Sequence, residues 1–217
     1  MPIEVNIPLW ADLAAVAIGS LQGALFASGF RDRRLDLLGV AIIGVATGLG
    51  GGLLRDLLLS ASPVALSTNW YLPTAVGAAL LGMLLAQLFR PLTALITILD
   101  ALTIGLYGAI GTAKALSFGL PVIPAVFVGV VAAVGGSVLR DILMALPIAL
   151  MHVGSLYAVA AAMGTVTLAV VQRSGMPIEV AATACVIITT VIRLLAVRFG
   201  WSLPEQRPLR RPHPRTL

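Results

Sequence analysis

Two apolar stretches of the sequence each carry a run of small residues followed, one helical turn later, by an arginine and an aspartate. Residues 44–59 read GVATGLGGGLLRDLLL and residues 129–144 read GVVAAVGGSVLRDILM, and eight of the sixteen aligned positions are identical. A charged side chain in the middle of a membrane span costs about 3 kcal/mol or more if it faces lipid. We therefore expect the charged residues of both stretches to face protein or water.

The first charged pair is Arg55 and Asp56, and the second is Arg140 and Asp141. Neighbouring residues of an α-helix point about 100° apart, so we expect each charged side chain to reach another helix rather than its own neighbour. The pairs then either line a path for ions or lock the fold through ion pairs between helices, and the two roles are compatible.

The small residues before each pair are further candidates for lining or gating a path. Each glycine loses about 1 kcal/mol of helix propensity relative to alanine. Three small residues in succession predict a break that exposes backbone carbonyl and amide groups to a water-filled path. The alternative is close helix packing, since Gly44, Gly48 and Gly52 recur at every fourth position. The candidates are Gly50, Gly51 and Gly52 in the first stretch and Gly135, Gly136 and Ser137 in the second.

Other polar residues in apolar stretches have simpler interpretations. Lys114 either extends to the outer membrane interface or contributes to the path, and we include it among the candidate pore residues. Asp12 and Asp100 lie near the start of spans, where a carboxylate caps a helix. Three threonine hydroxyls are expected to bond backbone carbonyls: Thr47, Thr103 and Thr112.

The sequence offers little for catalysis or for a cofactor. It contains no Ser/His pairing, no HExxH motif and no carboxylate spacing that would fix a metal. One cysteine, Cys185, and two histidines, His152 and His213, cannot form a disulfide framework or a thiolate metal site. We expect no enzyme activity, no bound metal and no cofactor.

Composition indicates the elements that must position these residues. The chain has 217 residues, of which 59% are hydrophobic and 11% charged, and its mean hydropathy is +1.03. Soluble domains carry roughly 25% charged residues, so this is an all-α polytopic membrane protein, because lipid leaves no partner for an unpaired backbone group. Seven apolar stretches are candidate transmembrane helices: residues 10–30, 36–60, 70–89, 93–117, 121–145, 150–171 and 177–199.

Basic residues are unevenly distributed among the connections between these stretches. One side of the membrane would hold little beyond Lys114 and Arg173. The positive-inside rule then places the N-terminus outside and the C-terminus in the cytoplasm. Despite a formal charge of +5, a tail facing anionic lipid is favoured over nucleic-acid binding. The other side would hold Arg31, Arg33, Arg34, Arg90, Arg198, Arg207, Arg210, Arg211 and Arg215.

The duplicated motif belongs to a longer internal repeat. Asp12 precedes Gly23 by the same eleven residues as Asp100 precedes Gly111. Each copy spans three helices, and because three is odd, the second copy enters the membrane from the opposite side and gives an inverted repeat with a path near the midplane. The expected parts are a first triplet in residues 1–92, an inverted triplet in 93–173, a seventh transmembrane helix in 174–199 and a basic, disordered cytoplasmic tail in 200–217.

The GLGGG-x-x-RD motif of the second span, matched by GGS-x-x-RD in the fifth, resembles prokaryotic members of the trimeric intracellular cation (TRIC) channel family. The resemblance extends to about residue 199. It implies a homotrimer in which every subunit carries its own K⁺-permeable path between broken second and fifth helices, with the glycine runs and Arg-Asp pairs at that path. Animal members bind a phosphoinositide through basic residues at the start of the fifth helix. Residues 121–127 (PVIPAVF) contain none, so this lipid site is not expected here.

Two functions fit these features. A passive K⁺-permeable channel would use carbonyl dipoles at the glycine runs, and the carboxylates would have to neutralise the arginines. The alternative is a secondary transporter for a small zwitterion such as glycine, because the same bacterial family has been labelled a putative glycine transporter and Arg55 or Arg140 would hold a carboxylate.

Overall fold

The computed structural model describes residues 8–29, 35–88, 93–151 and 156–203. All regular structure in these residues is helical. The α-helices are α1 (Leu9–Gly29), α2 (Leu37–Leu58), α3 (Tyr71–Leu88), α4 (Thr93–Ser117), α5 (Val122–Leu143), α6 (Tyr157–Arg173) and α7 (Ile178–Phe199), and two single 3₁₀ turns are η1 (Val64–Leu66) and η2 (Ala149–Met151).

Six of these helices are long and apolar enough to cross a membrane, and α6 is a shorter apolar helix of 17 residues. The predicted start of the sixth span near residue 150 is wrong, because the 3₁₀ turn η2 follows Pro147 and α6 begins only at Tyr157. Large apolar side chains face outward, such as Leu84 at 51% and Ile187 at 56% exposure, as contact with lipid requires. His152 and the tail after residue 203 lie outside the described residues.

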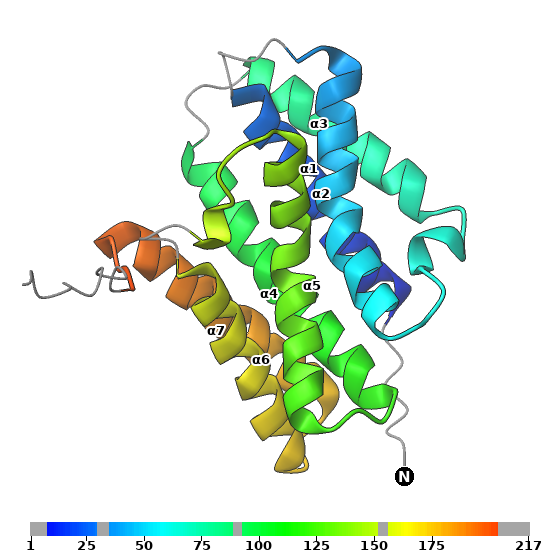
Figure 1. Cartoon of the computed structure of the whole chain (residues 1–217), viewed down its shortest axis with the longest axis vertical. Helices are drawn as coiled ribbons and strands as arrows, with labels where there is room; N and C mark the ends of the chain where they lie inside the picture. Colours follow the sequence, from blue (N-terminus) through cyan, green and yellow to red (C-terminus); the bar gives the residue numbers. More distant parts are fainter. Residues whose placement is uncertain (1–7, 30–34, 89–92, 152–155, 204–217) are drawn as a thin grey trace, which may run out of the picture.

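The helices are arranged as two inverted triplets with one helix added. Helix α1 packs against α2 and α3, α4 packs against α5 and α6, and α2 and α5 pack against each other between the triplets. Figure 1 shows α2 running downward and α5 upward, and α1 and α4 are likewise opposed. Helix α7 packs against α4 and α6. The predicted inverted three-plus-three repeat with a seventh helix is confirmed.

The expected helix breaks at the glycine runs are wrong, because α2 and α5 are α-helical throughout. The small residues instead let the two helices approach closely. A Cβ atom on Gly51 would collide with the carbonyl oxygen of Ala132, and one on Gly136 would collide with that of Thr47. Close packing, the alternative interpretation, therefore explains Gly50, Gly51, Gly135 and Gly136, whereas a Cβ atom on Gly52 would meet its nearest neighbours only at 3.9 Å.

The close approach is itself symmetric between the triplets. A Cβ atom on Gly50 would lie 2.6 Å from Leu139 Cδ1, and one on Gly135 would lie 2.6 Å from Leu54 Cδ1. Leu54 and Leu139 occupy the same position of the repeated motif. The inversion axis of the repeat thus passes through the α2–α5 contact.

Candidate functional site

One cluster of buried charges lies where α2 ends. Arg55 is fully buried, and its Nε lies 2.7 Å from Asp56 Oδ1 while its Nη1 lies 3.5 Å from Asp12 Oδ1. Lys114 Nζ on α4 lies 2.8 Å from the same oxygen of Asp56. Tyr71 donates its hydroxyl hydrogen to Asp12 Oδ2 at 2.8 Å. Three helices from both triplets and the start of α3 therefore meet at this cluster.

A second cluster lies at the opposite end, where α5 ends. Arg140 Nη2 lies 2.8 Å from Asp141 Oδ1. Asp100 on α4 accepts a hydrogen bond from the Tyr157 hydroxyl. Arg193 Nη2, on α7, lies 3.5 Å from Asp100 Oδ2. Because this end also receives a charge from α7, the seventh helix is part of the site.

The two clusters repeat each other in their local geometry. In both, the second oxygen of the aspartate accepts a backbone N–H from the following 3₁₀ turn: Val64 N to Asp56 Oδ2 at 2.8 Å and Ala149 N to Asp141 Oδ2 at 2.9 Å. Each motif thus ties the end of its helix to the next segment.

The structure bears on three expectations about these charges. The expectation that neighbouring Arg and Asp would not pair is wrong, because the long arginine side chain folds back along the helix onto the next residue in both motifs. The expected reach to other helices is also present, from Arg55 to Asp12 and from Asp56 to Lys114. Lys114 lies in the last turn of α4 and binds Asp56, so it is part of the charge cluster. Asp12 lies in the first turn of α1, as a capping role requires, but Asp100 is the eighth residue of α4, so the capping interpretation is wrong for Asp100. The hydroxyls of the threonines do bond carbonyls as expected: Thr47 to Ile43, Thr103 to Leu99 and Thr112 to Gly108.

The charges balance within each cluster. Arg55 and Lys114 face Asp12 and Asp56 at one end. Two arginines, Arg140 and Arg193, face two aspartates at the other. The arginines of the spans are therefore neutralised locally, which removes the electrostatic preference for anions that unpaired arginines would create.

The two clusters differ at one equivalent position. Lys114 follows Asp100 by the same fourteen residues as Phe26 follows Asp12. Lys114 adds a second cation to Asp56, whereas Phe26 lies under the guanidinium of Arg140, whose Cζ is 3.9 Å from the ring centroid. Arg193 stacks similarly on Tyr157, at 4.1 Å. Cation–π contacts of this kind hold the two arginines of the second cluster in place.

A cavity of about 450 Å³ opens beside the second cluster. Its polar lining residues include Gln22, Thr97, Asp100, Arg140, Asp141 and Arg193. Two further cavities of about 10 Å³ each lie within the helix bundle, and 10 Å³ is about the space of one water molecule. The first shares Gln22 and Asp100 with the large cavity, and the second reaches Asp12 and Tyr71 of the other cluster.

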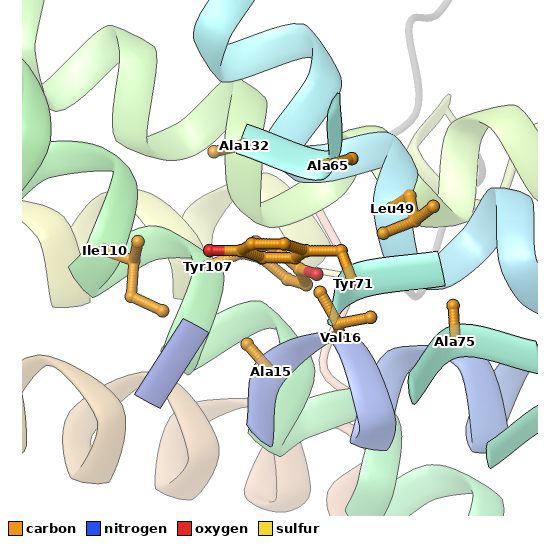
Figure 2. Packing of buried hydrophobic residues seen from close by; sticks show 9 residues of the cluster. All are labelled: Ala15, Val16, Leu49, Ala65, Tyr71, Ala75, Tyr107, Ile110 and Ala132. Carbon is orange, nitrogen blue, oxygen red and sulfur yellow. The ribbon is translucent and has the colours of Figure 1, made fainter. Parts of the chain in front are cut away.

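Tyr107 of α4 lines both small cavities and lies between them. Figure 2 shows it within a buried cluster that includes Val16 of α1, Leu49 of α2 and Tyr71 of α3. Its hydroxyl donates a hydrogen bond to the carbonyl of Gly48. Tyr107 was not among the residues predicted from the sequence, although it is an aromatic residue with a polar tip in the middle of an apolar span.

The predicted site residues fall into three groups. Gly136 and Ser137 line the first small cavity and Gly52 lines the second. Gly50, Gly51 and Gly135 lie at the α2–α5 contact. The charged candidates make up the clusters, with Arg140 and Asp141 at the large cavity, and Arg55, Asp56 and Lys114 at the far end.

Comparison with known proteins places these features in a family. The model of the family described as glycine transporter matches residues 9–87 and 97–173. The chain is 31% identical over 198 residues to the UPF0126 inner membrane protein YadS of Escherichia coli K12, covering 90% of this chain and 94% of that protein. The UPF0126 membrane protein YvgT of Bacillus subtilis is 27% identical over 205 residues, which is 91% of this chain and 96% of YvgT.

Two solved structures are similar over almost their full length. The TRIC trimeric intracellular cation channel orthologue from Rhodobacter sphaeroides superposes with a TM-score of 0.82 at 27% identity, covering 89% of this chain and 98% of that one. A second TRIC cation channel structure superposes with a TM-score of 0.80 at 30% identity, covering 94% and 99%.

Proposed function

The chain belongs to the family described as glycine transporter, and because it is also similar to UPF0126 membrane proteins and to TRIC cation channels, we propose that it is a cation channel of the bacterial inner membrane. In this proposal three identical subunits assemble, and each carries its own K⁺-permeable path. The observation that carries the proposal is a row of three cavities that share lining residues, from the large cavity, past the contact between α2 and α5, to the first charge cluster.

The lining of this row supports cations as the permeant species. Thr47, Thr103 and Ser137 contribute hydroxyl oxygens to the first small cavity, and Asp100 contributes a carboxylate. Oxygen ligands and carbonyl dipoles replace part of the hydration shell of a cation, whereas anions need donors. The arginines beside the path are each paired with an aspartate, so their charge does not oppose K⁺.

The orientation proposed from the basic residues assigns the two ends of the path. With the C-terminus in the cytoplasm, the large cavity faces the cytoplasm, because it lies at the end of α7 that carries Arg193 and Val197. The cluster of Arg55, Asp56 and Lys114 then faces outward.

Reconstitution in planar bilayers tests the channel. In a KCl gradient, the reversal potential should lie near the K⁺ potential, and a shift to the Cl⁻ potential contradicts cation conduction. Native mass spectrometry in detergent should give the mass of three subunits, and a monomer under all conditions contradicts the proposed trimer.

The second candidate function is a transporter for a small zwitterion, which the description of the family model favours. The large cavity could hold such a molecule between Arg140 or Arg193 and the carboxylate of Asp100. Saturable uptake of labelled glycine into liposomes without ohmic current would select this function over the channel.

A further inference from the structure

The two small cavities of the row, of about 10 Å³ each, share one lining residue, Tyr107, which lies at the boundary between them. Each cavity holds about one water molecule, so neither admits a hydrated K⁺ ion. Tyr107 is only 2% exposed, and its hydroxyl is bonded to the Gly48 carbonyl of α2, which fixes the ring across the row.

Only the second triplet carries a large side chain at this position of the inverted repeat. Tyr107 follows Asp100 by seven residues, and the residue that follows Asp12 by seven is Gly19. A Cβ atom on Gly19 would lie 3.7 Å from Tyr107 Cε2 and 3.1 Å from Gly48 Cα. The ring therefore lies beside the position at which the other triplet has no side chain, and a second side chain there would meet both α2 and the ring.

Apolar packing, rather than ion pairing, holds the ring of Tyr107 in place. Its neighbours in the buried cluster include Val16, Leu49 and Ile110. The hydrogen bond of its hydroxyl crosses from α4 to the small-residue segment of α2, which is also the segment packed against α5. Tyr107 thus connects the second triplet to the first at the level where the path is narrowest.

We propose that Tyr107 is the residue that closes the ion path, with the closed state held by the hydrogen bond from its hydroxyl to the Gly48 carbonyl. The path conducts when the ring leaves this position and the two small cavities join. This inference rests on the proposed channel function, and it assigns closure to one residue of α4 rather than to bending of α2 and α5 at their glycines.

The first experiment compares K⁺ flux into liposomes for the wild type, Tyr107→Phe and Tyr107→Ala. Tyr107→Phe keeps the ring and removes one hydrogen bond, so it should raise flux by about fivefold. Tyr107→Ala should raise flux further, because the wall between the cavities is gone. Leu168→Ala is the matched control: it truncates a fully buried side chain on α6 outside the three cavities and should leave flux unchanged.

Equal flux in the wild type and Tyr107→Phe, or a rise of the same size in Leu168→Ala, overturns the inference. Size-exclusion elution of each variant checks its assembly. If Tyr107→Ala does not fold, the comparison of the wild type with Tyr107→Phe decides the inference.

A second experiment decides the inference even if no current is found in any variant, which would contradict the proposed channel function itself. In a Cys185→Ala background, single cysteines are introduced as Ser137→Cys, in the cavity on the side of the large one, and Val16→Cys, in the cavity beyond Tyr107. A membrane-impermeant cationic thiol reagent is applied from the side of the large cavity. Ser137→Cys should react more than tenfold faster than Val16→Cys, and adding Tyr107→Ala should remove the difference. A Val16→Cys rate that does not change on adding Tyr107→Ala overturns the inference.

Discussion

At the scale of single residues, every charged side chain of the two motifs forms an ion pair with a residue of opposite charge. Asp56 binds both Arg55 and Lys114, and Asp141 binds Arg140. Removing one partner from a buried pair leaves an uncompensated charge, which costs more than the pair contributes. Substitutions at these positions are therefore expected to change stability, and those beside the proposed path are also expected to change ion permeation.

Replacing Lys114 tests how much the ion pairs at Asp56 contribute to the stability of the protein. Lys114→Met removes a charged hydrogen bond to Asp56 and should lower the free energy of unfolding by about 2 kcal/mol. Unfolding by SDS in mixed micelles, followed by circular dichroism, measures it. The double variant with Asp56→Asn should be less destabilised than the sum of the two single variants, and strict additivity would show that the two residues do not interact.

Replacing Asp100 tests whether the charge at the large cavity controls which ions permeate. Asp100 lines both the large cavity and the small cavity next to it, so Asp100→Asn leaves this end of the path with one surplus positive charge. A unit charge about 10 Å away contributes about 1.7 kcal/mol at an effective dielectric constant of about 20, so the K⁺ to Cl⁻ permeability ratio should fall at least about tenfold. Reversal potentials in a KCl gradient measure the ratio.

Asp36→Asn is the control for that substitution, because Asp36 is an exposed carboxylate that caps α2 and lines none of the three cavities. It should leave the ratio unchanged. If Asp36→Asn and Asp100→Asn shift the reversal potential equally, the effect is one of surface charge and the assigned path is wrong.

At the scale of the helices, the contact between α2 and α5 organises the molecule. Gly51 and Gly136 occupy equivalent positions and each faces a backbone carbonyl of the other helix. Two helices that approach to backbone contact leave no room for a break or for a wide channel at that level. The path therefore passes beside this contact, where α1 and α4 complete its wall with Val16 and Tyr107.

The close approach of α2 and α5 predicts that a glycine-to-alanine substitution lowers stability at Gly51 and raises it at Gly77. Gly51→Ala should destabilise the protein by about 1–3 kcal/mol, because the new methyl group overpacks the contact with Ala132. Gly77→Ala on α3 has no atom within 4 Å of the new Cβ and should stabilise the helix by up to about 1 kcal/mol. Mixed-micelle unfolding of both variants measures this, and equal effects would contradict the packing account.

At the scale of the whole molecule, inversion of the triplets and the extra helix α7 together decide which ends share a side of the membrane. Three spans reverse the direction of the chain, so the first and second triplets are opposed, and a seventh span places the C-terminus opposite the N-terminus.

The proposed orientation is therefore testable with reporters. Green fluorescent protein fused at the C-terminus should be fluorescent in Escherichia coli, and alkaline phosphatase fused there should be inactive, since the tail is expected in the cytoplasm. A phosphatase fusion after Pro121, in the connection between α4 and α5, should be active. The reverse pattern would contradict the orientation and exchange the two faces of the path.

The sequence by itself determined the number of helices, their approximate limits and the duplication. These properties are local: an apolar stretch must form a helix in lipid, and a repeated motif with polar positions is visible without knowing what it contacts. For the same reason the backbone acceptors of Thr47 and Thr103 were predictable, because a carbonyl one turn earlier is always within reach.

Only the tertiary structure decided what lies opposite each side chain. Whether the glycine runs break or pack depended on the carbonyls of Ala132 and Thr47 approaching from the other helix. The partners of Lys114 and Asp100 depended on how α4 lies against α2, α6 and α7, and the position of Tyr107 beside the cavities depended on the absence of a side chain at Gly19. Such contacts join residues far apart in the chain, and no spacing along one helix specifies the helix that faces it.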